Sequence, residues 1–148
     1  MSASALDKHY PIQHGDYTRA GEASADIKRT LRQLGVSADM MRRVSVAAYE
    51  AEMNMVIHSL GGEMCLQVEA DHIRLTTQDV GPGIADIDSA MREGFSTANE
   101  EAQSMGFGAG MGLPNIKRNA DAFNIHSQPG QGTCVTVRWA EQLAEEAR

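Results

Sequence analysis

The chain has 148 residues and 42% of them are hydrophobic, which predicts one compact domain and excludes a multidomain enzyme. Its formal net charge is −7 and it has no run of Lys or Arg, which argues against a nucleic-acid-binding surface because phosphate contacts need clustered cations. No segment is long and apolar enough to cross a membrane, and the N-terminal segment lacks a secretory signal, so we expect a cytoplasmic protein with no membrane contact.

The N-terminal part predicts a strand followed by a short helix. Residues 1–8 are expected to form a disordered leader ahead of a strand at His9–Tyr17. Pro11 would keep this strand at a sheet edge, because proline has no N–H to donate to a second neighbour. Apolar residues at helical spacing then predict a helix over 25–34, which Gly35 ends in the manner of a C-terminal cap.

The next segment predicts a long helix and a β-hairpin. Ser37 or Asp39 can cap the helix, which runs to about Ser59 and ends at a pair of glycines. Two strands with alternating apolar residues follow at 63–70 and 73–80, joined by a tight turn.

The second half of the chain is dominated by glycine. Residues 81–112 hold seven of the fourteen glycines, so a loop region is expected there, with a short helix at 86–93. A third helix is predicted at 113–123, with proline tolerated in its first turn. Two more strands, at 123–127 and 133–139, flank a turn rich in Pro and Gly.

These elements predict a single domain over residues 9–139, followed by an acidic tail at 140–148. The two cysteines, Cys65 and Cys134, lie far apart inside the predicted strands and have no spacing typical of a metal or redox site. We therefore expect both to be buried packing residues, as free cysteines commonly are.

The long helix carries polar residues where its apolar pattern predicts burial. Glu50, Asn54 and His58 follow one line on the apolar side of the helix. One interpretation is that Glu50 and Asn54 are satisfied by hydrogen bonds inside the core. The other is a site in which Asn54 supplies an oxygen to a hard cation and Glu50 acts as a base. A solvent-facing stripe is predicted on the opposite side and contains Arg42, Ser45, Tyr49 and Glu52.

Two glycine clusters follow the hairpin. The segment Asp79-Val80-Gly81-Pro82-Gly83 places a carboxylate at a strand end before two glycines, an arrangement that fits either a turn or a close approach to a ligand. The run Gly106–Gly112 has glycine at every second position and opens directly into a helix. Its backbone N–H groups favour an anion such as a polyphosphate, although a loop without a ligand is the simpler alternative. It matches neither the Walker A pattern nor the dinucleotide-binding fingerprint.

Together these motifs resemble the ATP-binding fold (GHKL superfamily, Bergerat fold) shared by gyrase, a class of heat-shock chaperones, histidine kinases and MutL. The motifs occur in the family's order: Glu50-x-x-x-Asn54-x-x-x-His58, Asp79-x-Gly81-x-Gly83, the run Gly106–Gly112, and Gly130-x-Gly132-Thr133. Over about residues 25–139 the chain is most similar to the anti-sigma-factor and stress-switch serine/threonine kinases of RsbW and RsbT type, and segments 93–97 and 112–118 favour the RsbT branch. The resemblance implies an α+β two-layer sandwich with a mixed, mostly antiparallel sheet and helices on one face.

The resemblance also implies roles for individual residues. Glu50 would be the catalytic base, Asn54 would coordinate Mg²⁺ bridging the phosphates of ATP, and Asp79 would accept the adenine amino group. Thr133 would reach the same edge of the base through a water. The residues implied in nucleotide binding are Asn54, Asp79, Gly81, Gly83, Gly106, Gly108, Gly110, Met111, Gly112, Leu113 and Thr133.

The implied function is a Mg-ATP-dependent kinase that phosphorylates a Ser or Thr on a STAS-domain antagonist protein, with a sigma factor or phosphatase regulator as a further partner and a homodimer as a possible state. This chain departs from the RsbW-like branch, because it has no Lys or Arg between Arg92 and Lys117, where that branch carries a basic residue before its lid. The alternative is therefore a nucleotide-gated module that binds a sigma factor or another regulator and catalyses little or no transfer.

Overall fold

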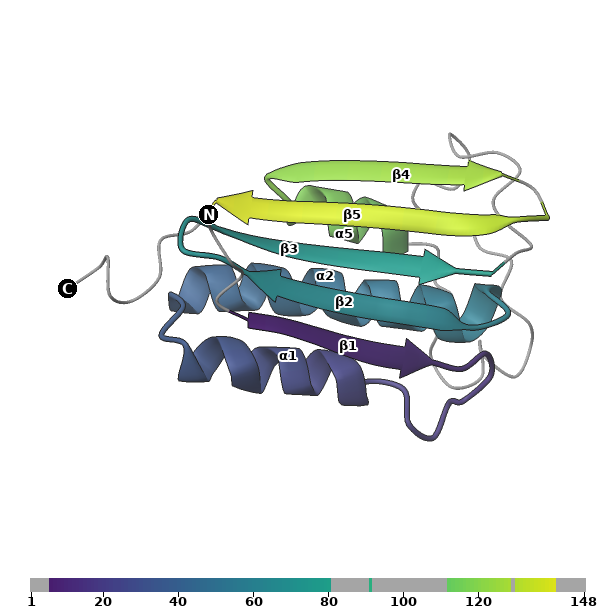
Figure 1. Ribbon diagram of the computed structural model, residues 1–148, viewed down its shortest axis with the longest axis horizontal. Helices are drawn as coiled ribbons and strands as arrows, with labels where there is room; N and C mark the ends of the chain where they lie inside the picture. The colour runs from purple at the N-terminus through teal and green to yellow at the C-terminus, as the bar shows by residue number, and fades with distance from the viewer. Residues whose placement is uncertain (1–5, 81–90, 92–111, 129, 141–148) are drawn as a thin grey trace.

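The fold is a two-layer α+β sandwich, as Figure 1 shows for a computed structural model that describes residues 6–80, 91, 112–128 and 130–140. Five strands form one sheet in the order β1-β2-β3-β5-β4, and every neighbouring pair is antiparallel. Helices α1, α2 and α5 lie against one face of this sheet, which confirms the predicted architecture. The elements in chain order are β1 Leu6–Ile12, α1 Glu22–Gln33, α2 Ala38–His58, β2 Gly62–Val68, β3 His72–Asp79, α5 Gly112–Arg118, β4 Ala122–Gln128 and β5 Gly132–Ala140.

The predicted element types are confirmed for the described residues, and the boundaries differ most at β1, α1 and α5. Strand β1 begins at Leu6, so residues 6–8 form a strand where the sequence predicts a disordered leader, and it ends at Ile12. It pairs only with β2, so Pro11 lies in an edge strand as expected. Helix α1 begins at Glu22. Gly21, directly before it, has a φ of 99°, a left-handed conformation that glycine adopts readily and that is not helical.

Helix α5 ends at Arg118 and does not continue to residue 123 as predicted. The chain leaves the helix at Asn119, whose carbonyl oxygen accepts a hydrogen bond of 2.6 Å from the indole N–H of Trp139 on β5. Residues after this point join the sheet instead, and Phe123 is paired with Val137. The boundary is set by a tertiary contact, which helical periodicity alone does not contain.

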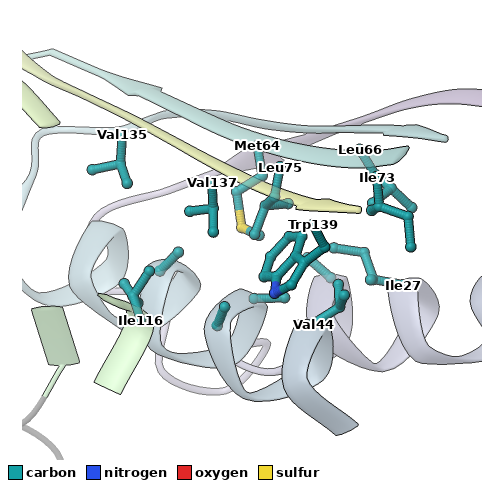
Figure 2. Close-up of a cluster of buried hydrophobic side chains, with 14 of the residues drawn as sticks. Ile27, Val44, Met64, Leu66, Ile73, Leu75, Ile116, Val135, Val137 and Trp139 are labelled. Atoms are coloured by element: carbon teal, nitrogen blue, oxygen red, sulfur yellow. The ribbon is translucent and has the colours of Figure 1, made fainter. Parts of the chain in front are cut away.

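The core lies between the sheet and α2. Figure 2 shows Trp139, Val137 and Leu75 of the sheet pointing toward Val44 of α2 and Ile116 of α5, and all five side chains are almost fully buried. The apolar line predicted for α2 is confirmed as its buried face: Val44, Ala48, Ala51 and Met55. Because this face is packed tightly, any polar group beside it needs a partner or an opening to solvent.

The predicted solvent stripe of α2 is wrong at Glu52, whose exposed fraction is only 2%. Its carboxylate accepts three backbone hydrogen bonds, from the N–H groups of Gly21 at 2.9 Å, Ala23 at 3.2 Å and Ser24 at 2.9 Å. These N–H groups begin α1 and have no partner within their own helix. Glu52 therefore caps α1 from a neighbouring helix, with its negative charge at the positive end of the helix dipole.

The expectation that both cysteines are buried is also wrong, because Cys65 and Cys134 are each partly exposed. Side chains alternate between the two faces of a strand, and β2 turns Met64 and Leu66 into the core. Cys65 between them must point to the face that no described helix covers. Among the helices that the structure describes, none has the length and hydropathy that a membrane crossing requires.

Candidate functional site

Glu50 and Asn54 lie one helical turn apart on α2, and both side chains are partly buried. Their neighbours Ala47, Ala51 and Met55 are almost fully buried. The two polar residues therefore lie at the margin of the core and not within it, which is what a site open to a ligand requires. The side chain of His58, the third residue of the predicted line, is outside the described part of the structure.

Glu50 has a defined partner in α5. The side-chain N–H of Asn115 donates a hydrogen bond of 3.2 Å to Glu50 Oε2. Arg118 in turn donates to Asn115 Oδ1 at 2.6 Å. Because Arg118 can only donate, the amide oxygen of Asn115 must face it, and the amide NH₂ must face the carboxylate. The three side chains thus form a directed chain from a guanidinium to the candidate base.

Asn115 is a residue that the sequence motifs do not single out. It lies in the first turn of α5, which starts at Gly112 at the end of the glycine run. The bond between Asn115 and Glu50 therefore brings the candidate base on α2 next to the segment that follows this run. The signal available in the sequence is an amide immediately after the glycines, but its partner is 65 positions away.

Asp79 ends β3, and its Oδ1 accepts a hydrogen bond of 2.8 Å from the backbone N–H of Thr133 on β5. Burial of the carboxylate raises the pKa of Asp79 above its usual value, and the Thr133 hydrogen bond opposes this effect. One carboxylate oxygen is thus fixed by the sheet, and its orientation does not depend on a ligand. A carboxylate held in this way is a pre-organised acceptor for an N–H donor.

Thr133 is buried, with an exposed fraction of 7%. Its hydroxyl lies 2.9 Å from Ser127 Oγ on β4, and Ser127 Oγ also lies 3.1 Å from the Gly132 carbonyl oxygen. Since Ser127 has one hydroxyl proton, donating it to that carbonyl leaves Thr133 as the donor between the two hydroxyls. Asp79 and Thr133 are thus joined by a hydrogen bond, while their contacts to adenine stay a prediction.

Gly62 is needed beside Asp79. A Cβ atom at this position would lie 2.2 Å from the Gln78 carbonyl oxygen and 2.7 Å from the Asp79 Cα atom. The two backbones are close because Gly62 and Asp79 are register partners in the β2–β3 pair. The sequence predicts Gly62 only as a helix stop, whereas its second role is to let the end of β3 approach β2.

The predicted adenine contacts, Asp79 and Thr133, lie at one end of the sandwich. The C-terminal ends of α2 and β3 and the start of β5 all lie at the right-hand end of Figure 1. Two backbone hydrogen bonds join the segments after α2 and β3, from Val80 N–H to the Gly61 carbonyl at 3.0 Å and from Leu60 N–H to the Val80 carbonyl at 3.2 Å. The candidate adenine contact and the candidate catalytic helix are therefore linked through backbone.

Several predicted site residues fall outside the described part of the chain. The residues concerned are Gly81, Gly83, Gly106, Gly108, Gly110 and Met111, and the short helix expected at 86–93 lies there too, apart from Met91. Gly112 and Leu113 begin α5, and Leu113 packs into the core with 8% exposure. The packing of Leu113 therefore gives no indication that its side chain contacts a nucleotide.

The donor set fits a hard cation. Asn54 offers an amide oxygen and Glu50 a carboxylate one turn away, and oxygen ligands of this kind suit Mg²⁺, which keeps several waters and binds phosphate oxygens. Asn54 would be the protein ligand, while Glu50 already has a hydrogen bond to Asn115. The arrangement can hold a metal-bound polyphosphate and place a base beside it.

Comparisons with known proteins agree with this fold. The family model of the histidine kinase-like ATPase domain matches residues 15–139. The serine/threonine-protein kinase RsbT of Bacillus subtilis is 30% identical over 117 residues, which cover 76% of this chain and 82% of RsbT. An anti-sigma F factor of Oceanobacillus iheyensis is 32% identical over 111 residues, covering 71% of this chain and 73% of that protein. The solved structure of the mycobacterial sensor histidine kinase MprB matches with a TM-score of 0.53 at 19% identity, over 92% of this chain and 99% of that chain, which supports the fold.

Proposed function

The chain belongs to the histidine kinase-like ATPase domain family, and from this membership we propose that it is a Mg-ATP-dependent serine/threonine protein kinase of a bacterial partner-switching system. The observation that carries the proposal is the Asn115 to Glu50 hydrogen bond, because it orients a carboxylate beside the helix that follows the glycine run. The relatives named as a serine/threonine kinase and as an anti-sigma F factor support the same function.

Phosphoryl transfer needs mainly positioning and charge stabilisation from the protein. The acceptor hydroxyl oxygen bonds to the γ-phosphorus, the bond from this phosphorus to the β–γ bridging oxygen breaks, and ADP leaves. Glu50 takes the proton of the acceptor hydroxyl, and Asn115 holds the Glu50 carboxylate in place during this transfer. Asn54 would hold Mg²⁺, which supplies positive charge to the phosphates when it is bound.

Adenine recognition rests on Asp79 in this proposal. Because its Oδ1 is occupied by the Thr133 N–H, Oδ2 is the oxygen that would accept the adenine amino group. The glycines at 81 and 83 would lie beside the base, and those at 106, 108, 110 and 112, with Met111, would cover the triphosphate. The protein substrate would be a STAS-domain antagonist, and a sigma factor or a phosphatase regulator would be a further partner.

A second function is favoured by the distribution of positive charge. No Lys or Arg lies between Arg92 and Lys117, and Arg118 is hydrogen-bonded to Asn115. A site with little cationic charge for the transferring group would bind nucleotide but transfer phosphate slowly. The alternative is therefore a module whose affinity for a sigma factor or another regulator changes with the nucleotide and which catalyses little or no transfer.

Transfer of ³²P from γ-labelled ATP to a purified STAS-domain partner separates the two functions. We expect labelled partner with the wild-type chain and a loss of about 10²–10⁴-fold with Glu50→Gln, the usual contribution of a general base. Asp39→Asn is the matched control, because Asp39 is an exposed acid in the first turn of the same helix and should leave transfer unchanged. Partner affinity that changes with ATP in the absence of transfer would instead favour the binding module.

A further inference from the structure

The face of the sheet that no described helix covers brings three different metal-ligating side chains together. His9 on β1 and Cys65 on β2 are directly opposite in the register, and Asp7 precedes His9 by two residues and so shares its face. This cluster is on the opposite face of the sheet from α2, so it is separate from the proposed nucleotide site. Among the described residues it is the only group of three or more His, Cys, Asp and Glu side chains with ligand atoms this close.

The distances between the three ligand atoms are within a few tenths of an ångström of those in a tetrahedral metal site. His9 Nε2 lies 3.0 Å from Asp7 Oδ1, Cys65 Sγ lies 3.4 Å from the same oxygen, and Sγ lies 3.8 Å from Nε2. A tetrahedral Zn²⁺ with bonds of about 2.0–2.3 Å separates its ligand atoms by about 3.3–3.6 Å. Shifts of a few tenths of an ångström, within reach of partly exposed side chains, would complete the geometry.

The outer contacts of His9 also fit a metal ligand. Its second ring nitrogen, Nδ1, lies 3.2 Å from Glu63 Oε1. Nε2 lies 3.0 Å from Asp7 Oδ1, so without metal both ring nitrogens face carboxylates and donate to them. The Nδ1–H bond to Glu63 fixes the ring, so that loss of the Nε2 proton would turn this lone pair toward Asp7 and Cys65. Metal-bound histidines characteristically donate their other N–H to a carboxylate in this way, which orients the ring and increases its basicity.

We propose that Asp7, His9 and Cys65 form a three-ligand site for Zn²⁺ on the outer face of the sheet, with Glu63 orienting His9 and a water in the fourth position. Thiolate and imidazole select a borderline-soft transition metal, and they select against Mg²⁺, which prefers oxygen ligands. Binding displaces two protons that now face Asp7 Oδ1, one from the Cys65 thiol and one from His9 Nε2, and both pass to solvent.

The site has a structural consequence because β1 is the edge strand of the sheet and is paired only with β2. A metal held by two side chains of β1 and one of β2 would link these strands. Since the unfolded chain does not preserve the arrangement, Zn²⁺ binding should raise the thermal stability by mass action. The expected role is to fix the N-terminal strand, and no change in nucleotide affinity is expected.

Titration of the full chain with Zn²⁺ by calorimetry, and with Co²⁺ by absorption, tests this site. We expect one-to-one binding at micromolar metal and a near-ultraviolet thiolate-to-cobalt band. Cys65→Ser should remove the band and weaken Zn²⁺ binding by at least about tenfold, and Glu63→Gln should weaken it by about tenfold or less. Cys134→Ser is the matched control, because Cys134 is a second partly exposed cysteine in the same sheet.

The variants should remain folded because Cys65, Glu63 and Cys134 are not part of the apolar core, and circular dichroism checks this. Equal loss of the cobalt band in Cys65→Ser and Cys134→Ser would overturn the proposal. So would the lack of saturable one-to-one binding by the wild-type chain at micromolar Zn²⁺.

Discussion

Two carboxylates in the second half of helix α2, two positions apart, face opposite neighbours and are used differently. Glu52 faces α1, is almost fully buried, and accepts three backbone hydrogen bonds. Glu50 faces α5, is partly exposed, and accepts one hydrogen bond, from Asn115. A carboxylate with both oxygens engaged by backbone N–H groups stabilises structure, whereas one with a single described side-chain partner has acceptor sites left for a substrate proton. Within one helical turn, therefore, Glu52 is a structural carboxylate and Glu50 is the candidate catalytic base.

The largest expected effect is on the free energy of unfolding, when each carboxylate is removed in turn. Glu52→Ala should lower the free energy of unfolding by about 3 kcal/mol, because three N–H groups at the start of α1 lose a charged acceptor. Glu50→Ala should lower it by about 1 kcal/mol or less, since only the Asn115 bond is lost. Urea unfolding followed by the fluorescence of Trp139, the single and fully buried tryptophan, measures both.

Equal destabilisation by the two substitutions would contradict the distinction between them. Glu52→Gln refines the measurement because it retains one acceptor oxygen and replaces the other with a donor. Its unfolding free energy should therefore lie between those of the wild type and Glu52→Ala.

The distinction between the two acids shows what the sequence can and cannot predict. Glu50 and Asn54 are identified from sequence because they violate the periodicity of their own helix, and the structure places both at the margin of the core. Glu52 obeys that periodicity as a solvent residue, yet it is buried by the segment that leads into α1. A helical pattern predicts the face turned to the sheet, but it contains no information on a loop that covers the other side.

The same limit explains the other residues that the sequence did not identify. Asn115 meets Glu50 across two helices, and Cys65 meets His9 across two strands, at separations of 65 and 56 positions. Such pairs have no spacing motif, because their distance depends on strand register and helix packing. Asp79 was identified because its signal is local, a carboxylate at a strand end followed by glycines. The structure joins it to Thr133 by a hydrogen bond, and its role in adenine binding stays a prediction.

The next effect concerns nucleotide binding at Asp79. Asp79→Asn should weaken Mg-ATP binding by about 2 kcal/mol, since a charge-assisted acceptor is replaced by an amide. Isothermal titration calorimetry measures the affinity, and Asp71→Asn is the control because Asp71 lies in the exposed turn before β3. Unchanged affinity in Asp79→Asn would remove this carboxylate from the nucleotide site.

The pH dependence of ATP binding follows from the same group. Burial raises the pKa of Asp79 in the nucleotide-free chain, and the protonated carboxyl group is a poorer acceptor for the adenine amino group. The affinity should therefore fall as the pH is lowered through this raised pKa. The Asp79→Asn variant should not show this fall, and a fall of equal size in both proteins would assign the effect to another group.

A smaller effect is expected on stability at low pH, through Asp26 in α1. Asp26 accepts hydrogen bonds from Lys8 Nζ at 2.7 Å and Tyr10 Oη at 2.6 Å, and the Lys8 contact is the main reason that the pKa of Asp26 is lowered to about 2. A carboxyl whose pKa is lowered by folding stabilises the fold above its ordinary value of 3.8, and this stabilisation is lost as the pH falls toward 2.

After allowance for solvent screening, this contribution is about 1 kcal/mol at pH 7. Asp26→Asn should therefore be less stable than the wild type at neutral pH, and the difference should shrink below about pH 4. Urea unfolding at a series of pH values measures it. A difference that stays constant down to the lowest pH would show that the effect is one of packing and not of charge.

The smallest effect should come from Asn115, because it acts through Glu50 and not on the substrate. Asn115→Ala leaves the Glu50 carboxylate without its orienting donor, at a cost to catalysis of about 1 kcal/mol, which corresponds to a roughly fivefold lower kcat. The KM for ATP should stay close to the wild-type value, since the proposed adenine contact of Asp79 is untouched. Asn115→Asp sharpens the test, because it retains the shape but places a second carboxylate beside Glu50, and repulsion between the two carboxylates should change the acid limb of the pH–rate profile. If Asn115→Asp leaves the pH–rate profile unchanged, the hydrogen bond holds α5 to α2 without tuning a base, and Glu50 then has the same structural use as Glu52.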